Sequence, residues 1–274
     1  MIRILDKGTI LRLIVPHLSK AKRGFTCRTS LANVVNAILY KFRTGCQWSL
    51  LPIRALIPKS TIKAGAVYHH FRKWSKDGSW KRVRKQLIRH NPWMLDLSLA
   101  HFDGTHARAI RGGRGVGYQG RKKSKTSNTL WLTDRYGLVV SYIPPMAGNH
   151  NDLFEIKSSF EYMLEDLKEI GVNPDGLFIN ADAGFDAASL RNLCDLEGIH
   201  LNAPVNPRRS SVDEFSLPYF DEMMYAERYV VERTNAWMDA HRSLLVRFDT
   251  TIESWAAWHD LYSILVWCRK ISKV

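Results

Sequence analysis

Three acidic residues of this 274-residue chain occupy settings in which carboxylates can perform metal-dependent chemistry. Asp103 follows a run in which apolar and small residues alternate, and Asp182 ends the apolar run 177–181. Glu232 lies in a stretch, 225–246, with a helical pattern. A carboxylate at the edge of a core is costly unless a cation or a donor compensates its charge. The three acids therefore predict a site that attracts positive charge.

Divalent magnesium suits such a site, because it prefers oxygen ligands and leaves positions for water and phosphate. Two such ions, about 3.5–4 Å apart, can activate an attacking oxygen and stabilise a leaving one in phosphodiester chemistry. The chain holds 26 acids, however, and an aspartate after an apolar run is also a common strand end or helix cap. The acids alone leave both interpretations open.

The charge of the chain is distributed unevenly along its length. Residues 1–96 carry 20 of the 40 lysines and arginines but only three of the 26 acids, whereas residues 97–274 share the other 20 with 23 acids. This asymmetry predicts a basic domain over residues 1–96 that binds a polyanion, followed by a separate domain over residues 97–274. The alternative is that the basic side chains only make a surface soluble.

Amphipathic helices are expected at residues 30–42, 60–76 and 80–88, where apolar residues recur three and four positions apart. Three short basic helices predict a small all-α domain of the helix-turn-helix type that binds DNA, with 60–76 as the candidate recognition helix. A bundle that only packs on the rest of the chain is the alternative. The basic residues expected to face DNA from this domain include Lys63, Arg72 and Lys73.

The second domain alternates strands and helices after an initial group of strands, which predicts an α/β fold with a mixed sheet. A Gly-rich and basic stretch, 107–128, is predicted to form a mobile loop or a long hairpin beside the acids. It holds three further candidates for DNA binding, Arg121, Lys122 and Lys123. The other elements expected are a hairpin over 129–143, a helix capped by Asn151 or Asp152, strands at 177–182 and 199–205, and helices at 186–197, 225–246 and 254–269.

Several ordered blocks resemble one family. Residues 103–106 (Asp-Gly-Thr-His), residues 182–186 (Asp-Ala-Gly-Phe-Asp) and the pattern Tyr225-x2-Arg228-x3-Glu232 closely resemble the three catalytic blocks of DDE transposases from bacterial insertion sequences. The resemblance extends from about residue 30 to residue 269. Residues 39–48, 148–152 and 230–237 also resemble this family, in particular its insertion sequence five subgroup.

The resemblance implies that the domain from about residue 97 is ribonuclease-H-like. Asp103, Asp182 and Glu232 would be its catalytic triad and would bind two Mg²⁺ or Mn²⁺ ions. Arg228 would grip a DNA phosphate beside the metal or orient Glu232. Such enzymes use water to free a 3′-OH at the element's ends, and that 3′-OH then attacks target DNA.

The expected partners are the terminal inverted repeats of an element and its target DNA, with a homodimer on DNA as the family implies. No apolar run approaches the about 18–20 residues that span a bilayer, and no signal peptide is evident, so a cytoplasmic protein that associates with the nucleoid is expected. Two rival functions remain at this point. One is a metal-dependent nuclease with the same triad, and the other is a transposase-derived DNA-binding protein without catalysis.

Overall fold

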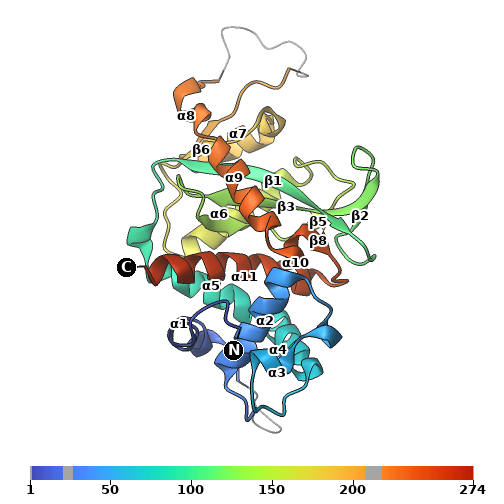
Figure 1. The fold of residues 1–274 in the computed structure, drawn as a ribbon. Helices are drawn as coiled ribbons and strands as arrows, with labels where there is room; N and C mark the ends of the chain where they lie inside the picture. The colour runs from blue at the N-terminus through green and yellow to red at the C-terminus, as the bar shows by residue number, and fades with distance from the viewer. Residues whose placement is uncertain (1, 21–26, 208–217, 274) are drawn as a thin grey trace. The chain divides into compact units, whose positions relative to one another are not determined.

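The computed structural model describes residues 2–20, 27–207 and 218–273, and the chain divides into two compact units (Figure 1). We call them the helical unit and the sheet unit. The sequence predicts a DNA-binding domain over residues 1–96 and a separate catalytic domain over residues 97–274, and this division of functions stays a prediction. As a packing unit, the C-terminal helix groups with the N-terminal helices. The helical unit comprises Met1–His90, Ile110–Arg114 and Met238–Val274, and the sheet unit comprises Asn91–Ala109 and Gly115–Trp237.

Helix α2 of the helical unit shows why these segments fold as predicted. Its large apolar residues recur at helical spacing and are mostly buried, it begins after Ser30, and it ends at Gly45, whose φ of 68° is the left-handed conformation that glycine adopts without strain. The helices expected at 60–76, 80–88 and 254–269 also form. The elements of this unit are α1 (Lys7–Leu13), η1 (Val15–His17), α2 (Leu31–Thr44), η2 (Trp48–Leu50), α3 (Ile53–Leu56), α4 (Ala64–Lys76), α5 (Ser79–Arg89), α10 (Arg242–Leu245), β8 (Val246–Arg247) and α11 (Ile252–Ile271).

The core of the helical unit is aromatic. Helix α11 packs against α4 and α5, and the ring of Trp258 stacks on that of Phe71 with centroids 4.1 Å apart. The apolar side of α4, with Phe71 and Trp74, is buried as its spacing predicts. The amphipathic pattern of 80–88 predicts that its basic residues, Arg84 included, face outward, and for Arg84 this prediction is wrong. The Arg84 side chain is buried, and its Nε donates to Oδ1 of Asp260 on α11 at 3.0 Å.

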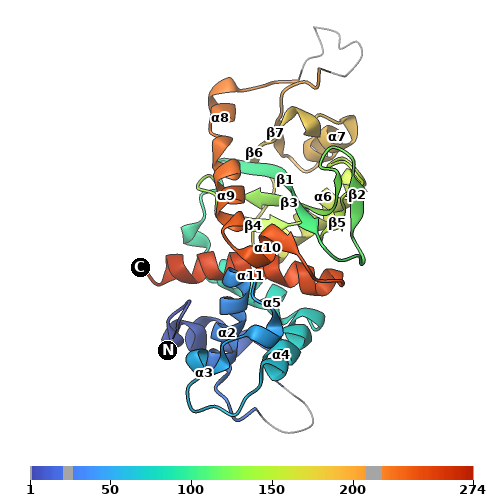
Figure 2. The ribbon, with the colours of Figure 1, turned by 45° about the vertical axis from the view of Figure 1, so that its right-hand side comes forward.

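The sheet unit contains a mixed sheet in the order β2-β3-β1-β6-β7, with β4 and β5 also paired to β3. Strand β1 is antiparallel to β3 and parallel to β6. Helix α9 covers one face of this sheet, and α6 and α7 cover the other (Figures 1 and 2). The predicted α/β class with a mixed sheet is confirmed. The elements are η3 (Pro92–Met94), β1 (Ala100–Ala109), β2 (Gly117–Gln119), β3 (Ser124–Thr133), β4 (Val139–Tyr142), β5 (Met146–Ala147), α6 (Ile156–Glu169), β6 (Phe178–Asn180), η4 (Ala183–Phe185), α7 (Ala188–Leu196), β7 (His200–Asn202), α8 (Glu222–Ala226) and α9 (Tyr229–Asp239).

Strand β1 is longer than the sequence predicts. The alternating run before Asp103 and the glycine after it predict a short strand that ends there in a turn, but β1 continues to Ala109 because its pairing with β3 extends to Arg108 opposite Thr126. Asp103 therefore lies inside a strand and not at its end. The stretch 107–128 supplies the end of β1, all of β2 and the start of β3, so the hairpin was the right one of its two predicted forms.

The single helix expected over 225–246 is broken into α8, α9 and α10. In a continuous helix the carbonyl of Met224 would accept from the backbone N–H of Arg228. Instead it accepts from Nδ2 of Asn180 at 2.6 Å, and Arg228 N–H donates to the carbonyl of Tyr225. The break lies directly before α9, which carries Glu232.

None of the helices in the described part of the chain combines the length and apolar character required to cross a bilayer.

Candidate active site and DNA-binding surfaces

Asp103 is held within β1 by the pairing of this strand with β3. Strand β1 pairs it with Trp131 of β3, and the parallel partner β6 aligns His101 with Asn180. The pKa of the Asp103 carboxyl is raised to about 6, chiefly by burial. The nearby carboxylates of Asp182 and Asp152 also act to raise this pKa, and the Gly104 backbone N–H and Arg228 act to lower it. Asp103 is thus a largely buried acid whose negative charge is only partly compensated.

Asp182 lies just beyond β6, the parallel neighbour of the strand that carries Asp103. Asp103 is two residues after His101 within β1, and Asp182 is two residues after Asn180, the last residue of β6. The Asp182 side chain accepts from the backbone N–H of Gly184 at 2.8 Å and so caps η4. The cap fixes the side chain, and its charge is close enough to act on Asp103.

Glu232 is linked to Asp103 through an arginine. Nη2 of Arg228 donates to Oε1 of Glu232 at 2.9 Å, and Nη1 of Arg228 lies 3.9 Å from Oδ2 of Asp103. Helix α9 is fixed on the sheet unit by Thr234, whose buried hydroxyl donates to the carbonyl of Gly137 at 3.0 Å. The side chain of Glu232 is 63% exposed, so it can change its direction without unpacking the helix.

Two neighbours of Asp103 were not predicted as site residues. Nδ2 of Asn235, three residues after Glu232 on α9, donates to Oδ2 of Asp103 at 3.2 Å. Asp152 was expected to cap a helix, but α6 begins after Glu155, and Asp152 lies against Gly104 instead. A Cβ at position 104 would come within 2.7 Å of Oδ1 of Asp152. The position of Asn235 one helical turn from Glu232 was a signal that could have found it.

The donor chemistry of these acids fits a hard divalent cation, since all of them offer carboxylate oxygens. In the described residues, no three Asp, Glu, His or Cys side chains converge closely enough to hold a metal ion as they stand. The guanidinium of Arg228 lies between Asp103 and Glu232, where it supplies part of the countercharge. The arrangement brings the three predicted acids into one region without closing them around one point.

The predicted DNA-binding residues at and within α4 differ in their exposure and in the contacts that they already make. Lys63 is exposed at the start of the helix, and the Arg72 guanidinium lies 5.8 Å from the centre of the Tyr68 ring. Nζ of Lys73 donates to the carbonyl of Ser19 at 3.1 Å, so this lysine also holds the fold. Lys63 and Arg72 are the better placed for a ligand.

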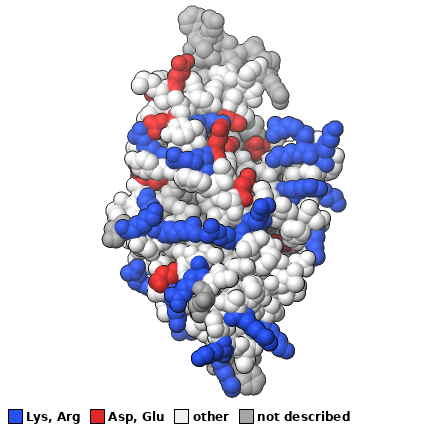
Figure 3. Space-filling view, viewed as in Figure 1, with Lys and Arg blue, Asp and Glu red and all other residues white. Residues whose placement is uncertain are grey.

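The basic residues between β2 and β3 are exposed. Arg121, Lys122 and Lys123 lie in the turn after β2, and Figure 3 shows Lys and Arg side chains gathered over this part of the sheet unit. Nζ of Lys122 donates to the backbone carbonyl of His106 at 3.3 Å, which ties the turn to the far half of β1. The hairpin thus presents exposed cations, and one of them contacts β1, the strand that carries Asp103.

Comparison with solved structures identifies the class of fold. The chain is similar to the piggyBac transposase in a synaptic complex with hairpin DNA, with 11% identity and a TM-score of 0.52 over 97% of this chain and 79% of that one. It is also matched to the Mos1 transposase paired-end complex with the left transposon end, with 10% identity and a TM-score of 0.31 over 91% and 80% of the two chains. The first likeness shows that the chain shares its overall fold with that transposase.

Comparison of the sequence gives the more particular likeness. Residues 10–84 match the family described as "Putative transposase of IS4/5 family". This match confirms the predicted resemblance and supports a DNA transposase of the IS4/5 kind. No curated protein matches the chain.

Proposed function

We propose that this chain is a DDE transposase that binds the terminal repeats of an insertion sequence, cuts a DNA strand at each end and joins the freed 3′-OH to target DNA. Asp103, Asp182 and Glu232 form its triad, and residues 97–274 form its catalytic domain. Residues 1–96 bind the element ends. The protein acts in the cytoplasm, as a homodimer when it is bound to DNA.

The observation that carries this proposal is that Asp182, just after β6, lies near enough to Asp103 on the parallel strand β1 for its charge to act on it, while Glu232 is linked to Asp103 through Arg228. Two of the acids are fixed by the backbone, and the third is on a helix that packs on the same sheet. An ordinary strand-end aspartate or helix cap would not require three carboxylates in one region at the cost of raising the pKa of Asp103.

Two Mg²⁺ or Mn²⁺ ions held by Asp103, Asp182 and Glu232 would activate the attacking oxygen and stabilise the leaving oxygen of the phosphodiester. Asn235 keeps the Asp103 carboxylate directed by its hydrogen bond to Oδ2. Arg228 compensates Asp103 and Glu232 before substrate arrives, and its bidentate guanidinium is then suited to hold a phosphate beside them. The cations of the β2–β3 turn hold the DNA backbone beside the triad.

The test uses labelled DNA that carries the two ends of the element, incubated with the full chain and Mg²⁺. We expect cleavage at the element boundary, and we expect Asp182→Asn and Glu232→Gln to reduce it by at least about 100-fold, as for the loss of one preorganised electrostatic contact. DNA binding should survive in both variants. The matched control is Glu161→Gln, an exposed glutamate on α6, which should cut normally.

Pre-cut ends separate the proposal from its two rivals. Joining of a pre-cut 3′-OH to target DNA supports a transposase, whereas cleavage without joining indicates a nuclease. Binding without cleavage or joining, in Mg²⁺ and in Mn²⁺, would indicate a DNA-binding protein that lacks catalysis. Near-normal turnover of Asp182→Asn would remove this residue from the triad.

A further inference from the structure

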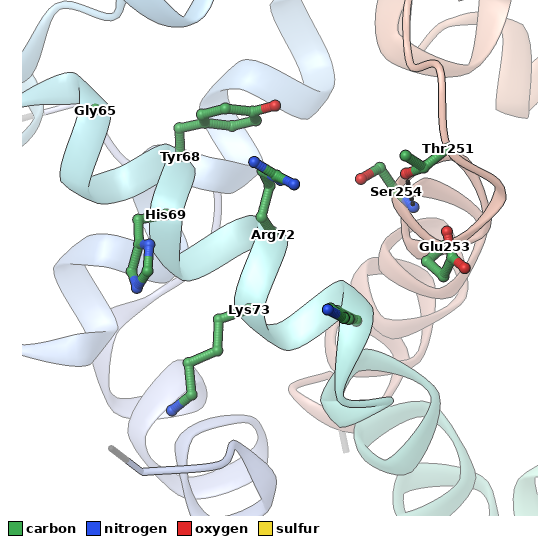
Figure 4. A pocket seen from close by; sticks show the side chains of 9 residues that line it. Gly65, Tyr68, His69, Arg72, Lys73, Thr251, Glu253 and Ser254 are labelled. Atoms are coloured by element: carbon green, nitrogen blue, oxygen red, sulfur yellow. Dashed lines mark hydrogen bonds between the residues drawn. The ribbon is translucent and has the colours of Figure 1, made fainter. Parts of the chain in front are cut away.

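The helical unit contains a groove between α4 and the start of α11 that no part of the proposed catalytic site uses. Two cavities, of about 720 and 910 Å³, adjoin there and share Tyr68, Arg72, Thr251 and Ser254 in their walls. Figure 4 shows Tyr68 and Arg72 pointing from α4 towards Thr251 and Ser254, whereas His69 and Lys73 point away. We call these two cavities together the α4–α11 groove.

The groove carries an excess of exposed positive charge. Arg72, Lys76 and Arg111 are exposed cations in its walls, and Glu253 is an exposed acid beside them. Asp249 also lines it, but its carboxylate is buried and accepts from Nε1 of Trp258 at 2.8 Å. The ligand that this lining favours is an anion.

Beside these cations the groove offers aromatic rings. Tyr68 is 37% exposed and Phe248 is 51% exposed, and both line the larger cavity together with Trp48. The rings of Tyr68 and Trp48 are 5.1 Å apart, and that of Trp48 lies 6.0 Å from Trp258 in the core.

The aromatic surface is rigid because it ends a stack that continues into the protein. Phe71 and Trp258 are fully buried with their centroids 4.1 Å apart, and Trp48 contacts both rings. Nζ of Lys41 lies 5.8 Å from the Trp48 ring and 5.5 Å from that of Trp258, and donates to Oγ of Ser243. A ring that stacks on Tyr68 or Trp48 from the groove therefore meets a platform that is already ordered.

Alternating anionic and flat groups are the chemistry of an unpaired nucleic acid strand, whose bases stack on aromatic side chains while cations follow its phosphates. The paired bases of a duplex are already stacked on one another and cannot reach rings inside a cavity. We propose that the α4–α11 groove binds unpaired DNA, with bases on Tyr68 and Phe248 and phosphates at Arg72 and Arg111. This inference rests on the proposed function, because it takes DNA to be the substrate.

The test measures the affinity of the full chain for two labelled probes by fluorescence anisotropy. One probe is an oligothymidylate of about ten nucleotides, within the range of known single-strand sites, and the other is a duplex of the element end. Tyr68→Ala and Phe248→Ala should each weaken binding of the oligothymidylate about 10-fold, as expected for the loss of one stacked base. Both variants should bind the duplex within about two-fold of the unchanged protein.

Two further variants separate stacking from damage to the fold. Tyr68→Phe keeps the ring and should bind the oligothymidylate nearly as well as the unchanged protein. Trp93→Ala removes an exposed ring that lines neither cavity and should have no effect. Equal losses for Tyr68→Phe and Tyr68→Ala would overturn the stacking assignment.

The outcomes also separate this inference from the function on which it rests. Binding of the duplex together with oligothymidylate binding that ignores Tyr68 and Phe248 would overturn the groove and leave DNA binding intact. If neither probe binds, the proposed function itself fails.

Discussion

The two units differ in how far a buried charge is compensated by a partner of opposite sign. In the helical unit the buried guanidinium of Arg84 is paired with the buried carboxylate of Asp260 at 3.0 Å. In the sheet unit the largely buried carboxylate of Asp103 has its nearest cation, Arg228, at 3.9 Å, and it shares its surroundings with the acids Asp152 and Asp182. One charge is fully compensated within the chain, and the other is not.

This difference distinguishes a charge that holds a fold from a charge that serves a ligand. A buried ion pair is retained when both partners are hydrogen-bonded, since removing either one leaves an uncompensated charge. An under-compensated acid raises the free energy of the unliganded protein, and a cation that binds to it lowers that free energy again. The comparison therefore predicts that substitution of Arg84 lowers the stability of the fold, whereas neutralising Asp103 raises it.

The largest effect is expected from Arg84→Ala, which leaves the Asp260 carboxylate buried without this partner. The free energy of unfolding, measured by urea denaturation, should fall by about 3–5 kcal/mol. Arg89→Ala, an exposed arginine on the same helix, should change it by less than about 0.5 kcal/mol. Similar small losses for both variants would show that the Arg84 pair is not structural.

A smaller effect is expected for Asp103, where the ionised carboxylate should destabilise the fold, in contrast to the stabilising charge of Arg84. The pH dependence of stability measures this effect. The folded-state pKa of Asp103, about 6, exceeds the value of about 3.9 in an unfolded chain, so the native state binds more protons between these values. With EDTA present, stability contributed by this group should be complete below about pH 4 and fall by at most about 3 kcal/mol as the pH rises past about 6.

Asp103→Asn provides the control for this pH dependence, because the amide resembles the protonated acid and does not titrate. The variant should be more stable than the unchanged protein at pH 7 and similar to it below about pH 4. Superimposable pH profiles of the two proteins would mean that Asp103 is well compensated, and the contrast with Arg84 would disappear.

The smallest of the three effects concerns the close approach of Asp152 to β1. In Gly104→Ala the new methyl group would lie 2.7 Å from Oδ1 of Asp152 and 2.9 Å from Cδ2 of Leu130, so stability should fall by about 1–2 kcal/mol. Gly120→Ala, where no atom lies within 4 Å of the added carbon, should be nearly neutral.

A double-mutant cycle sharpens this last prediction. In an Asp152→Ala background, Gly104→Ala should cost less, because one of its two close contacts is gone. Equal costs in both backgrounds would assign the strain to Leu130 alone and remove Asp152 from the immediate surroundings of Asp103.

Local patterns were sufficient for elements whose signals lie within the element itself. The limits of α2 follow from Ser30, Gly45 and the apolar spacing between them, and the hairpin of β3 and β4 follows from the strand residues that flank its turn. The resemblance placed the three acids in catalytic blocks. The structure adds that Asp103 lies within β1 and that Asp182 follows the parallel strand β6.

The features that were missed depend on partners distant in the sequence. Nothing near Arg84 in the chain indicates Asp260, and nothing near residue 228 indicates that Asn180 will take the Met224 carbonyl and end α8. Asp152 has the spacing of a helix cap, and only the fold brings it to Gly104. Periodicity reports which face of an element is apolar, but not which polar group will meet it.

The three acids differ in what an insertion or a deletion would do to them. Asp103 lies within β1 and is paired with Trp131 of β3, so a one-residue slip of this register would turn its side chain to the other face of the sheet. Asp182 lies after the end of β6 and Glu232 lies on α9, so neither side chain depends on the β1–β3 register. A change of chain length near Asp103 is therefore the change that this arrangement would tolerate least.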